Sequence, residues 1–591
     1  MAGRQGAAPG ALVPPVSSPG GPARARPEAG ETAPSGSLVP GARHRWRGVG
    51  LAVLCVSLLV VSLDNTILNV ALPTIVRDLH ASTSELQWVV DSYVVVFAGF
   101  LLTLGSLGDR IGRKPVFLGG LAVFAAGSAA SAFCTTAGSL IAARAVMGVG
   151  AAAIMPSTLS ILINLFPEPA ERERAIGIWS GTTGLGVAIG PVAGGWLLAH
   201  YWWGSVFLVN VPIALAGLVL GAAVLPSSKD PASKPPDPLG AVLSTAGMAL
   251  LLWGVIEAPT RSWSSPVVLG AIALGLAVLA GFVLFERRSS HPMLELSFFS
   301  SRRFSAAMGA MALVIFALMG SLFVLTQYLQ FSLGYSALQT GLRIAPIACI
   351  LLVAAPLSMV AVRRVGTKPV VFTGMSMIAA GLFLASRVSA HGSYGDVLPG
   401  FVLMGLGTGL AFAPCTDSVM GSLPLEQAGV GAATNSAALQ TGAALGVAVL
   451  GSLLNTRYQS RLTPLLVRHH VPKPLLELIT GSLGGALAVA GHVGGRLGAA
   501  LAAVARQAFV SGLDLALLTG AGVVAAGAVV AVVLIPNRAP SPPVPACDAG
   551  SARPGQDGAG AGLTPQQPGG RAPRGSRSSR PPRGRSRSRP R

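Results

Sequence analysis

The chain has 591 residues, of which 51% are hydrophobic and only 11% are charged, and its formal net charge is +20. So apolar a composition excludes an ordinary soluble globular protein and indicates a polytopic membrane protein. Apolar blocks of about 20 residues, separated by short polar turns, favour an all-α protein over an outer-membrane barrel, whose strands alternate in ten-residue segments.

The apolar blocks predict about fourteen transmembrane helices. Lys and Arg gather in alternate short loops, which places both termini in the cytoplasm of a cell-membrane protein. Residues 454–511 are expected to form a long extracellular loop. The expected spans lie near residues 48–72, 86–106, 115–133, 139–163, 175–199, 204–225, 238–258, 266–285, 305–329, 340–361, 369–387, 397–418, 430–453 and 513–535.

Both ends of the chain differ in composition from the spans. Residues 1–47 are rich in Pro, Gly and Ala, and residues 536–591 end in "RGSRSSRPPRGRSRSRPR". These compositions predict disordered cytoplasmic tails. The basic C-terminal tail could touch RNA, but we favour a solvated tail that contacts anionic lipid head groups over one that binds a specific nucleic acid.

A repeat divides the membrane region. "GRKPVFLGG" at 112–120 and "GTKPVVFTG" at 366–374 share several residues, and each opens an apolar block after a short basic turn. We therefore expect six-helix halves at 48–225 and 291–535, separated by two additional helices within 226–290. Such halves typically flank a central cavity and expose it to either side of the membrane in turn.

Several kinds of site lack sequence support. The five cysteines are scattered without a CxxC pair, so neither a metal site nor a disulfide framework is expected. The sequence has no Gly-Lys dipeptide and therefore no P-loop for ATP. No cofactor is expected, and an ion gradient is left as the source of energy.

Three ionisable residues are predicted to lie in the outer half of the membrane: Asp64 in the first span, Asp91 in the second and Arg144 in the fourth. A charge inside a bilayer costs at least about 2.5 to 3.5 kcal/mol, so these side chains should face a cavity or one another. Asp64 and Arg144 fit a proton site, although a purely structural ion pair is the alternative.

Asp91 fits a counter-ion for a cationic substrate. The alternative is a hydrated residue at the outer interface, where Trp88 and Tyr93 are expected to belong to an aromatic belt. The remaining candidate substrate contacts are the polar residues Asn65, Asn69, Glu257, Asn435 and Gln440. A capping or snorkelling role is favoured for Glu257, because it is expected at a span end.

Four motifs carry a family resemblance. "GSLGDRIGRKP" (105–115) resembles the major facilitator signature between spans two and three, and "RAVMGVGAA" (144–152) is similar to the span-four motif. "GVAIGPVAGG" (186–195) resembles the antiporter motif of span five, and "LDNTILNVALP" (63–73) the span-one motif of fourteen-span drug:proton antiporters. The resemblance covers most of residues 45–535 and implies a major facilitator fold.

The family resemblance implies a conformational latch in the loop after span two. Its residues are Gly105, Asp109, Arg110, Gly112, Arg113 and Lys114. Acid and base at helix ends can hold two halves in one state, although a simple positive loop is the alternative. The second copy of the repeat has Thr367 and no matching Asp, which puts a symmetric latch in doubt.

A strip of small residues marks span five: Gly186, Gly190, Pro191, Gly194 and Gly195. Small residues let helices approach closely, so a plain packing seam is expected in any case. The family resemblance further implies tight packing against span eight, which favours antiport.

The function predicted from these features is proton-driven export of hydrophobic, cationic or antibiotic-like compounds by a monomer in the lipid bilayer. A proton-coupled importer on the same fold is the first alternative. A membrane-embedded enzyme or a sensor is the second, and it is disfavoured because the spans show no nucleophile–base or metal constellation.

Overall fold

The computed structural model describes residues 40–228, 236–289, 292, 294–423 and 428–535. All regular secondary structure in these ranges is helical, and 14 of the helices are long and apolar enough to cross a membrane. The predictions of an all-α polytopic membrane protein and of about fourteen spans are therefore confirmed. Most of the two tails that were predicted to be disordered lies outside the described residues.

The first group of helices forms six candidate spans, because α6 and α7 together make one of them. In this group α4 packs on both α2 and α3, and α5 packs on α1. The helices are α1 (Pro40–Leu79), α2 (Thr83–Ile111), α3 (Arg113–Ala132), α4 (Ala137–Leu165), α5 (Pro169–His200), α6 (Ser205–Leu208) and α7 (Asn210–Val224).

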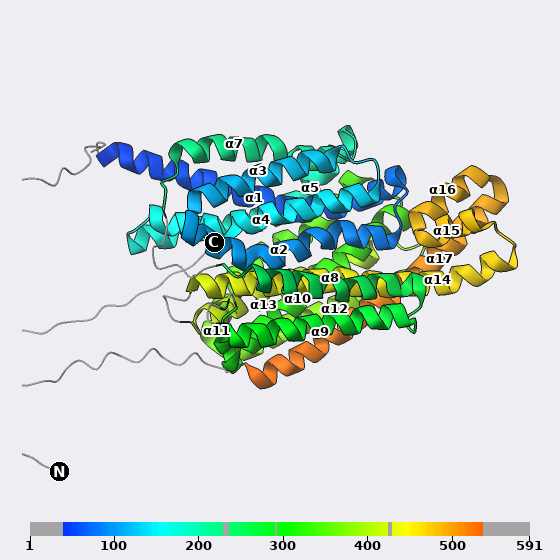
Figure 1. Ribbon diagram of the computed structural model, residues 1–591. Coiled ribbons are helices and arrows are strands. Elements are labelled where there is room, and N and C mark those ends of the chain that lie inside the picture. Colours follow the sequence, from blue (N-terminus) through cyan, green and yellow to red (C-terminus); the bar gives the residue numbers. More distant parts are fainter. Residues whose placement is uncertain (1–39, 229–235, 290–291, 293, 424–427, 536–591) are drawn as a thin grey trace, which may run out of the picture. The chain divides into compact units, whose positions relative to one another are not determined.

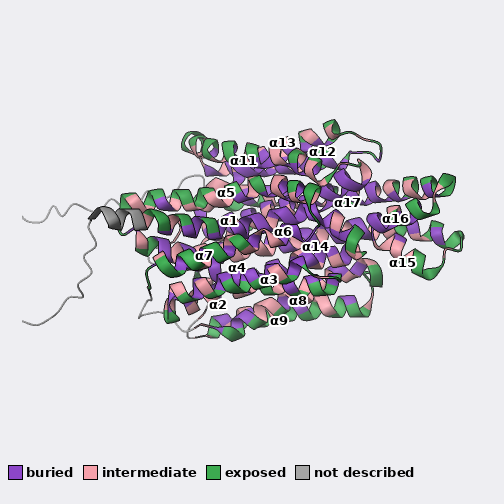
Figure 2. Ribbon diagram, turned by 90° about the horizontal axis from the view of Figure 1, so that it is seen from above, coloured by how far each residue is buried: buried purple, intermediate pink, exposed green. Residues whose placement is uncertain are grey.

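Two additional helices follow, α8 (Pro238–Arg261) and α9 (Pro266–Arg288). They pack on each other, and α8 also contacts α2 and α14 (Ala428–Arg468), so this pair borders both groups of helices. α9 is largely exposed (Figure 2). An apolar and exposed helix face is suited to contact with lipid tails.

The last group of helices repeats the pairwise packing of the first. α12 packs on α13, α10 on α14 and α11 on α13 (Figure 1). Besides α14, its elements are η1 (Leu296–Ser300), α10 (Arg302–Gln327), η2 (Tyr328–Ser332), α11 (Ala337–Val365), α12 (Thr367–Ser386), α13 (Tyr394–Met420), α15 (Lys473–Gly481), α16 (Leu483–Val493) and α17 (Gly495–Leu534).

The sequence repeat is also a repeat of backbone geometry. Gly112 ends α2 and precedes α3, whereas Gly366 ends α11 and precedes α12. Both glycines have positive φ, 127° and 92°, a conformation that L side chains disfavour. The helix that follows has 20 residues in both copies.

Residues 454–511 differ from the sequence-based expectation of a long loop. α14 continues to Arg468, α17 begins at Gly495, and α15 and α16 connect them, so most of the segment is helical (Figure 1). Its polar residues occupy faces of helices that extend past the apolar blocks. A search for apolar blocks ends each helix where its apolar stretch ends, although the backbone hydrogen bonds continue.

The first helix also departs from the prediction at both ends. It begins at Pro40, within the expected N-terminal tail, and it continues through Pro73 to Leu79. The expected span ended at residue 72, directly before Pro73. Proline is tolerated inside membrane helices, because neighbouring groups satisfy the backbone carbonyl that it frees.

Candidate functional site

Capping boxes fix where α2 and α4 begin, and these helices carry Asp91 and Arg144. Ser82 and Glu85 form a capping box that begins α2, and Thr136 and Ser139 form another that begins α4. A capping box satisfies backbone N–H groups that the first helical turn leaves free. Arg144 therefore lies on α4 about two turns beyond a fixed start, and its long side chain reaches α1.

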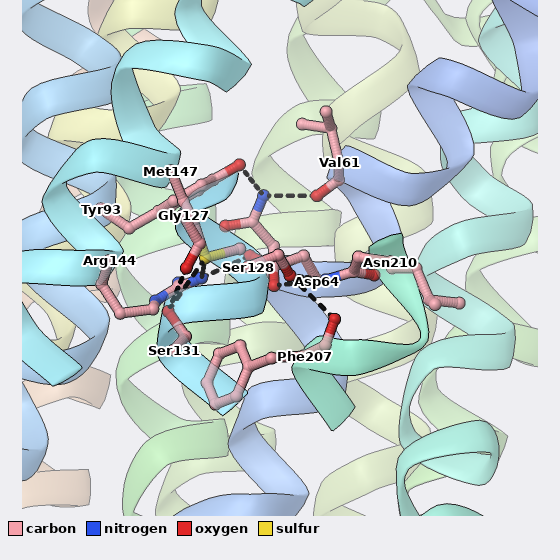
Figure 3. Close-up of polar contacts among 12 residues, drawn as sticks. Val61, Asp64, Tyr93, Gly127, Ser128, Ser131, Arg144, Met147, Phe207 and Asn210 are labelled. Carbon is pink, nitrogen blue, oxygen red and sulfur yellow. Dashed lines mark hydrogen bonds and ion pairs between the residues drawn. The ribbon is translucent and has the colours of Figure 1, made fainter. Parts of the chain in front are cut away.

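Asp64 and Arg144 form a buried ion pair between α1 and α4. Arg144 Nη1 donates to Asp64 Oδ2, and the two side chains are 0% and 1% exposed. Figure 3 shows Asp64 between Arg144 on one side and Asn210 on the other. The sequence predicted these two residues as partners, and the structure brings them together.

Arg144 has partners besides Asp64. Its Nε donates to the Val89 carbonyl at 3.1 Å, and its guanidinium carbon lies 4.2 Å from the centre of the Tyr93 ring. A cation over an aromatic face gains about 0.5 to 2 kcal/mol, more when it is desolvated. Tyr93 was expected in an aromatic belt at the outer interface; instead it is fully buried against Arg144.

Two further polar residues complete the network and were not identified from the sequence. Asn210 Nδ2 donates to Asp64 Oδ1 at 3.1 Å and to Ser128 Oγ at 3.2 Å. The Ser128 hydroxyl donates to the Phe207 carbonyl at 2.8 Å. Asn210 and Ser128 are both 0% exposed, and both lie beside Asp64 (Figure 3). In the sequence, each looked like an ordinary polar residue in an apolar block, and only the fold reveals that they meet at Asp64.

Asp91 lies on another side of α2. Consecutive helical residues are rotated by about 100°, so Asp91 points about 200° away from Tyr93, which faces Arg144. One turn before Asp91, Gln87 donates to the carbonyls of Val447 and Ala448 on α14. Asp91 is 0% exposed, and within the described residues neither of its carboxylate oxygens has a hydrogen-bond partner. The alternative of a hydrated interfacial residue is therefore wrong.

An apolar cavity lies between the two groups of helices. Its space for solvent is about 30 Å³, roughly that of one water molecule. Of the predicted substrate contacts, Asn69 lines this cavity, and its Nδ2 donates to the Asn65 carbonyl. The lining comes from α1, α5, α10 and α11: Thr66, Asn69, Val70, Val187, Pro191, Leu318, Leu322, Ile344, Ile347, Ala348 and Leu351.

The other predicted substrate residues lie elsewhere. Asn65 Nδ2 donates to the Val61 carbonyl and to Tyr93 Oη, close to the ion pair. Glu257 forms an i,i+4 ion pair with Arg261 at the end of α8. Asn435 and Gln440 lie on α14, buried and half-buried respectively.

The predicted latch forms contacts within the first group of helices. Arg113 Nε donates to Asp109 Oδ1 at 2.7 Å. The Arg113 backbone N–H donates to the Ser228 carbonyl, and Lys114 Nζ donates to the Ala222 carbonyl at the end of α7. Arg110 is exposed, and Gly105 packs against Pro156 of α4. These contacts tie the turn between α2 and α3 to the chain after α7.

The glycine strip of α5 packs on α1 and α11. A Cβ at Gly186 would lie 2.6 Å from Ser62 Cβ, and one at Gly194 would lie 2.6 Å from Ile67 Cγ1, while one at Gly190 would meet Thr66. On the other side, a Cβ at Gly195 would lie 2.6 Å from Leu338 Cα.

α11 also has a glycine at this contact, because a Cβ at Gly341 would clash with the Pro191 carbonyl of α5. The family resemblance implied packing on the eighth span of this chain, which is α9; the strip packs instead on α11, the tenth. The two additional helices displace the numbering of the second half by two.

The described part of the chain contains no set of side chains that could bind a metal ion. No group of three or more His, Cys, Asp or Glu side chains lies close enough there to hold an ion. The four cysteines of that part are free thiols: Cys55, Cys134, Cys349 and Cys415.

Comparison with known proteins identifies similar sequences and similar folds. The sequence model of the Major Facilitator Superfamily matches residues 54–447. The chain is 36% identical to the tetracenomycin C resistance and export protein of Streptomyces glaucescens, over 85% of this chain and 95% of that protein. It is 37% identical to the multidrug efflux pump LfrA of Mycolicibacterium smegmatis, over 85% of this chain and 98% of that pump.

A third relative and one solved structure extend the comparison. The methyl viologen resistance protein SmvA of Salmonella typhimurium is 31% identical, over 78% of this chain and 92% of that protein. The crystal structure of a bacterial homologue of the human lysosomal transporter Spinster, in an inward-facing conformation, superposes with a TM-score of 0.57 at 15% identity. That match covers 83% of this chain and 98% of the other, and it concerns the fold.

Proposed function

This chain belongs to the major facilitator superfamily, and we propose that it exports hydrophobic drug-like or antibiotic molecules across the cell membrane in exchange for protons. The observation that carries the proposal is the buried Asp64–Arg144 pair, because Asp64 lies on the same helix, α1, as the cavity residues Thr66 and Asn69. Protonation at Asp64 and reshaping of the cavity wall can therefore be linked through α1.

The substrate class is supported by the relatives and by the cavity. The relatives are named for export of tetracenomycin C, for multidrug efflux and for resistance to methyl viologen. Nine of the eleven cavity-lining residues have hydrocarbon side chains, which suits an apolar solute held with few specific hydrogen bonds. Drug-sized ligands occupy pockets of about 300 to 1,000 Å³, so the cavity must widen before such a molecule enters.

The energies show how the ion pair can be opened by a proton. Breaking a buried ion pair by neutralising one member costs about 3 to 5 kcal/mol. One pH unit supplies about 1.4 kcal/mol per proton, and a membrane potential of 100 mV adds about 2.3 kcal/mol per charge. The Val89 carbonyl and the Tyr93 ring retain Arg144 when Asp64 is neutral, and they lower the cost of opening.

The remaining parts of the proposal follow from the same fold. We place both termini in the cytoplasm, and we expect a monomer that uses neither a cofactor nor a nucleic acid and catalyses no covalent reaction. The cluster of Asp109 and Arg113 is proposed to act as a conformational latch. An importer on the same fold is the alternative, and the close packing of α5 on α1 and α11 favours antiport over it.

Transport in membrane vesicles tests the proposal. Everted vesicles that contain the protein are energised with an inward-acid pH gradient, and uptake of the fluorescent cation ethidium is followed alongside tetracenomycin C, puromycin and methyl viologen. We expect uptake of at least one compound, release of protons when it is added, and loss of uptake with a protonophore. Vesicles with Asp64→Asn serve as the matched control. Substrate movement in the same direction as protons would establish the importer instead.

A further inference from the structure

The orientation of the Asn210 side chain follows from its neighbours. A hydroxyl group has one hydrogen, and Ser128 gives its hydrogen to the Phe207 carbonyl at 2.8 Å. Ser128 Oγ is then left with lone pairs toward Asn210, so the Asn210 atom at 3.2 Å must be the amide nitrogen. The hydrogen bond from Ser128 to the backbone thus determines which end of the amide faces the site.

The same nitrogen reaches Asp64. Both amide hydrogens of Asn210 have acceptors, one in Ser128 Oγ and the other in Asp64 Oδ1 at 3.1 Å. If the amide were reversed, its oxygen would face the Ser128 lone pairs and the Asp64 carboxylate, so acceptors would oppose acceptors. In the observed orientation, Asn210 Oδ1 is buried and has no partner among the described residues. The amide is therefore held with its donor toward Asp64 even though its own acceptor remains unused.

We propose that Ser128 and Asn210 are positioning residues that hold a hydrogen-bond donor toward Asp64 and thereby favour release of its proton. This role rests on the proposed exchange of protons at Asp64. The charged and titratable groups that face Asp64 are Arg144 on α4 and Tyr93 on α2. Asn210 on α7 adds an uncharged donor from a third helix, whose direction is set by Ser128 on α3.

The two residues make different contributions, and this difference makes the proposal testable. Without the Ser128 hydroxyl, the Asn210 amide is free to rotate and to accept a hydrogen bond from protonated Asp64. Without the amide, the carboxylate loses its donor altogether. A carboxylate that loses a hydrogen-bond donor is less stable relative to its protonated form, so we expect the pH midpoint of Asp64 protonation to rise by about one unit in either variant.

The experiment compares the wild-type protein with Ser128→Ala and Asn210→Leu. Ser131→Ala is the matched control, because Ser131 lies one turn along α3 and is equally buried. Its hydroxyl has the Gly127 carbonyl and Met147 Sδ as partners, and neither of these is Asn210 or Asp64. Each purified protein is treated with dicyclohexylcarbodiimide, which adds to protonated carboxyl groups in apolar surroundings. Mass spectrometry then measures labelling at Asp64 as a function of pH. The pH profile of ethidium export is measured in vesicles with the same four proteins.

The expected result is a labelling midpoint about one pH unit higher in Ser128→Ala and Asn210→Leu than in the wild type, with Ser131→Ala unchanged. A midpoint for Ser128→Ala that equals the wild-type value, or lies below it, overturns the proposal. If Asn210→Leu does not insert, Ser128→Ala decides alone. If the wild type exports none of the compounds, the proposed function fails, and the labelling midpoint still tests the two residues.

Discussion

The two copies of the repeat have the same backbone and different chemistry. Gly112 and Gly366 both adopt positive φ, and each precedes a helix of 20 residues. In the first copy, Asp109 and Arg113 form an ion pair across this turn, whereas the second copy has Thr367 and no acid at the matching place. The two copies therefore share how the chain turns and differ in which groups carry charge.

The two halves also differ in whether their buried polar residues carry charge. The buried acidic and basic residues of the described chain are Asp64, Asp91 and Arg144 in the first half and Asp237 and Glu286 at the two additional helices. In the part of the second half that the structure describes, the buried polar residues are uncharged, for example Thr326, Gln327 and Asn435. We infer that the first half contains the proton chemistry and that the second half supplies an apolar wall.

The largest expected effect comes from neutralising the acid of the first half. Asp64→Asn should abolish gradient-driven export, a loss of at least about 100-fold, because the ion pair with Arg144 then no longer depends on a proton. Thr326→Val is the matched change in the second half, since Thr326 is fully buried on α10 and its hydroxyl has no partner among the described residues. Ethidium export by both variants in vesicles checks the contrast; equal losses would contradict it.

Because Gly112 and Gly366 both have positive φ, substituting either glycine should destabilise the protein to the same extent. Gly112→Ala and Gly366→Ala should each lower the free energy of unfolding by about 1 to 3 kcal/mol, because alanine is strained at positive φ. Gly119→Ala on α3 is the control, since a Cβ there has open space. Thermal unfolding in detergent measures all three. A loss confined to Gly112→Ala would show that the turns are not equivalent.

A smaller effect is expected from the second buried acid of the first half. Asp91→Asn should weaken export of the divalent cation propidium by about tenfold, the monovalent ethidium less, and neutral chloramphenicol not at all, because an unpaired buried carboxylate attracts cations strongly. Export rates of the three compounds are compared in one vesicle preparation. Equal losses for charged and neutral compounds would remove Asp91 from substrate selection.

The smallest effect on stability is expected at the charged turn itself. Asp109 and Arg113 are partly exposed, and an i,i+4 ion pair of this kind contributes about 0.3 to 0.5 kcal/mol. Asp109→Asn should therefore hardly change thermal unfolding, yet slow the conformational exchange that limits transport. Equilibrium binding of ethidium and its rate of export separate the two effects. Lost affinity with a normal rate would argue against a latch.

The sequence predicted features that depend on composition and on pairing of opposite charges. Fourteen spans follow from apolar block length, and the partnership of Asp64 with Arg144 follows from the cost of lone charges in a bilayer. The roles of Asn210 and Ser128 could not be predicted, because they depend on which faces of α7 and α3 meet α1. The direction of Asp91 was missed for the same reason.

The helices α14 and α17, which α15 and α16 connect, are much longer than a membrane span and can act as a lever. These helices have 41 and 40 residues, hence lengths of about 60 Å, twice the hydrocarbon thickness of a bilayer. A rotation of about 10° would displace a tip about 30 Å beyond the membrane by about 5 Å. A fluorophore attached near the end of α14 would therefore magnify small rotations of the second half into measurable changes of distance.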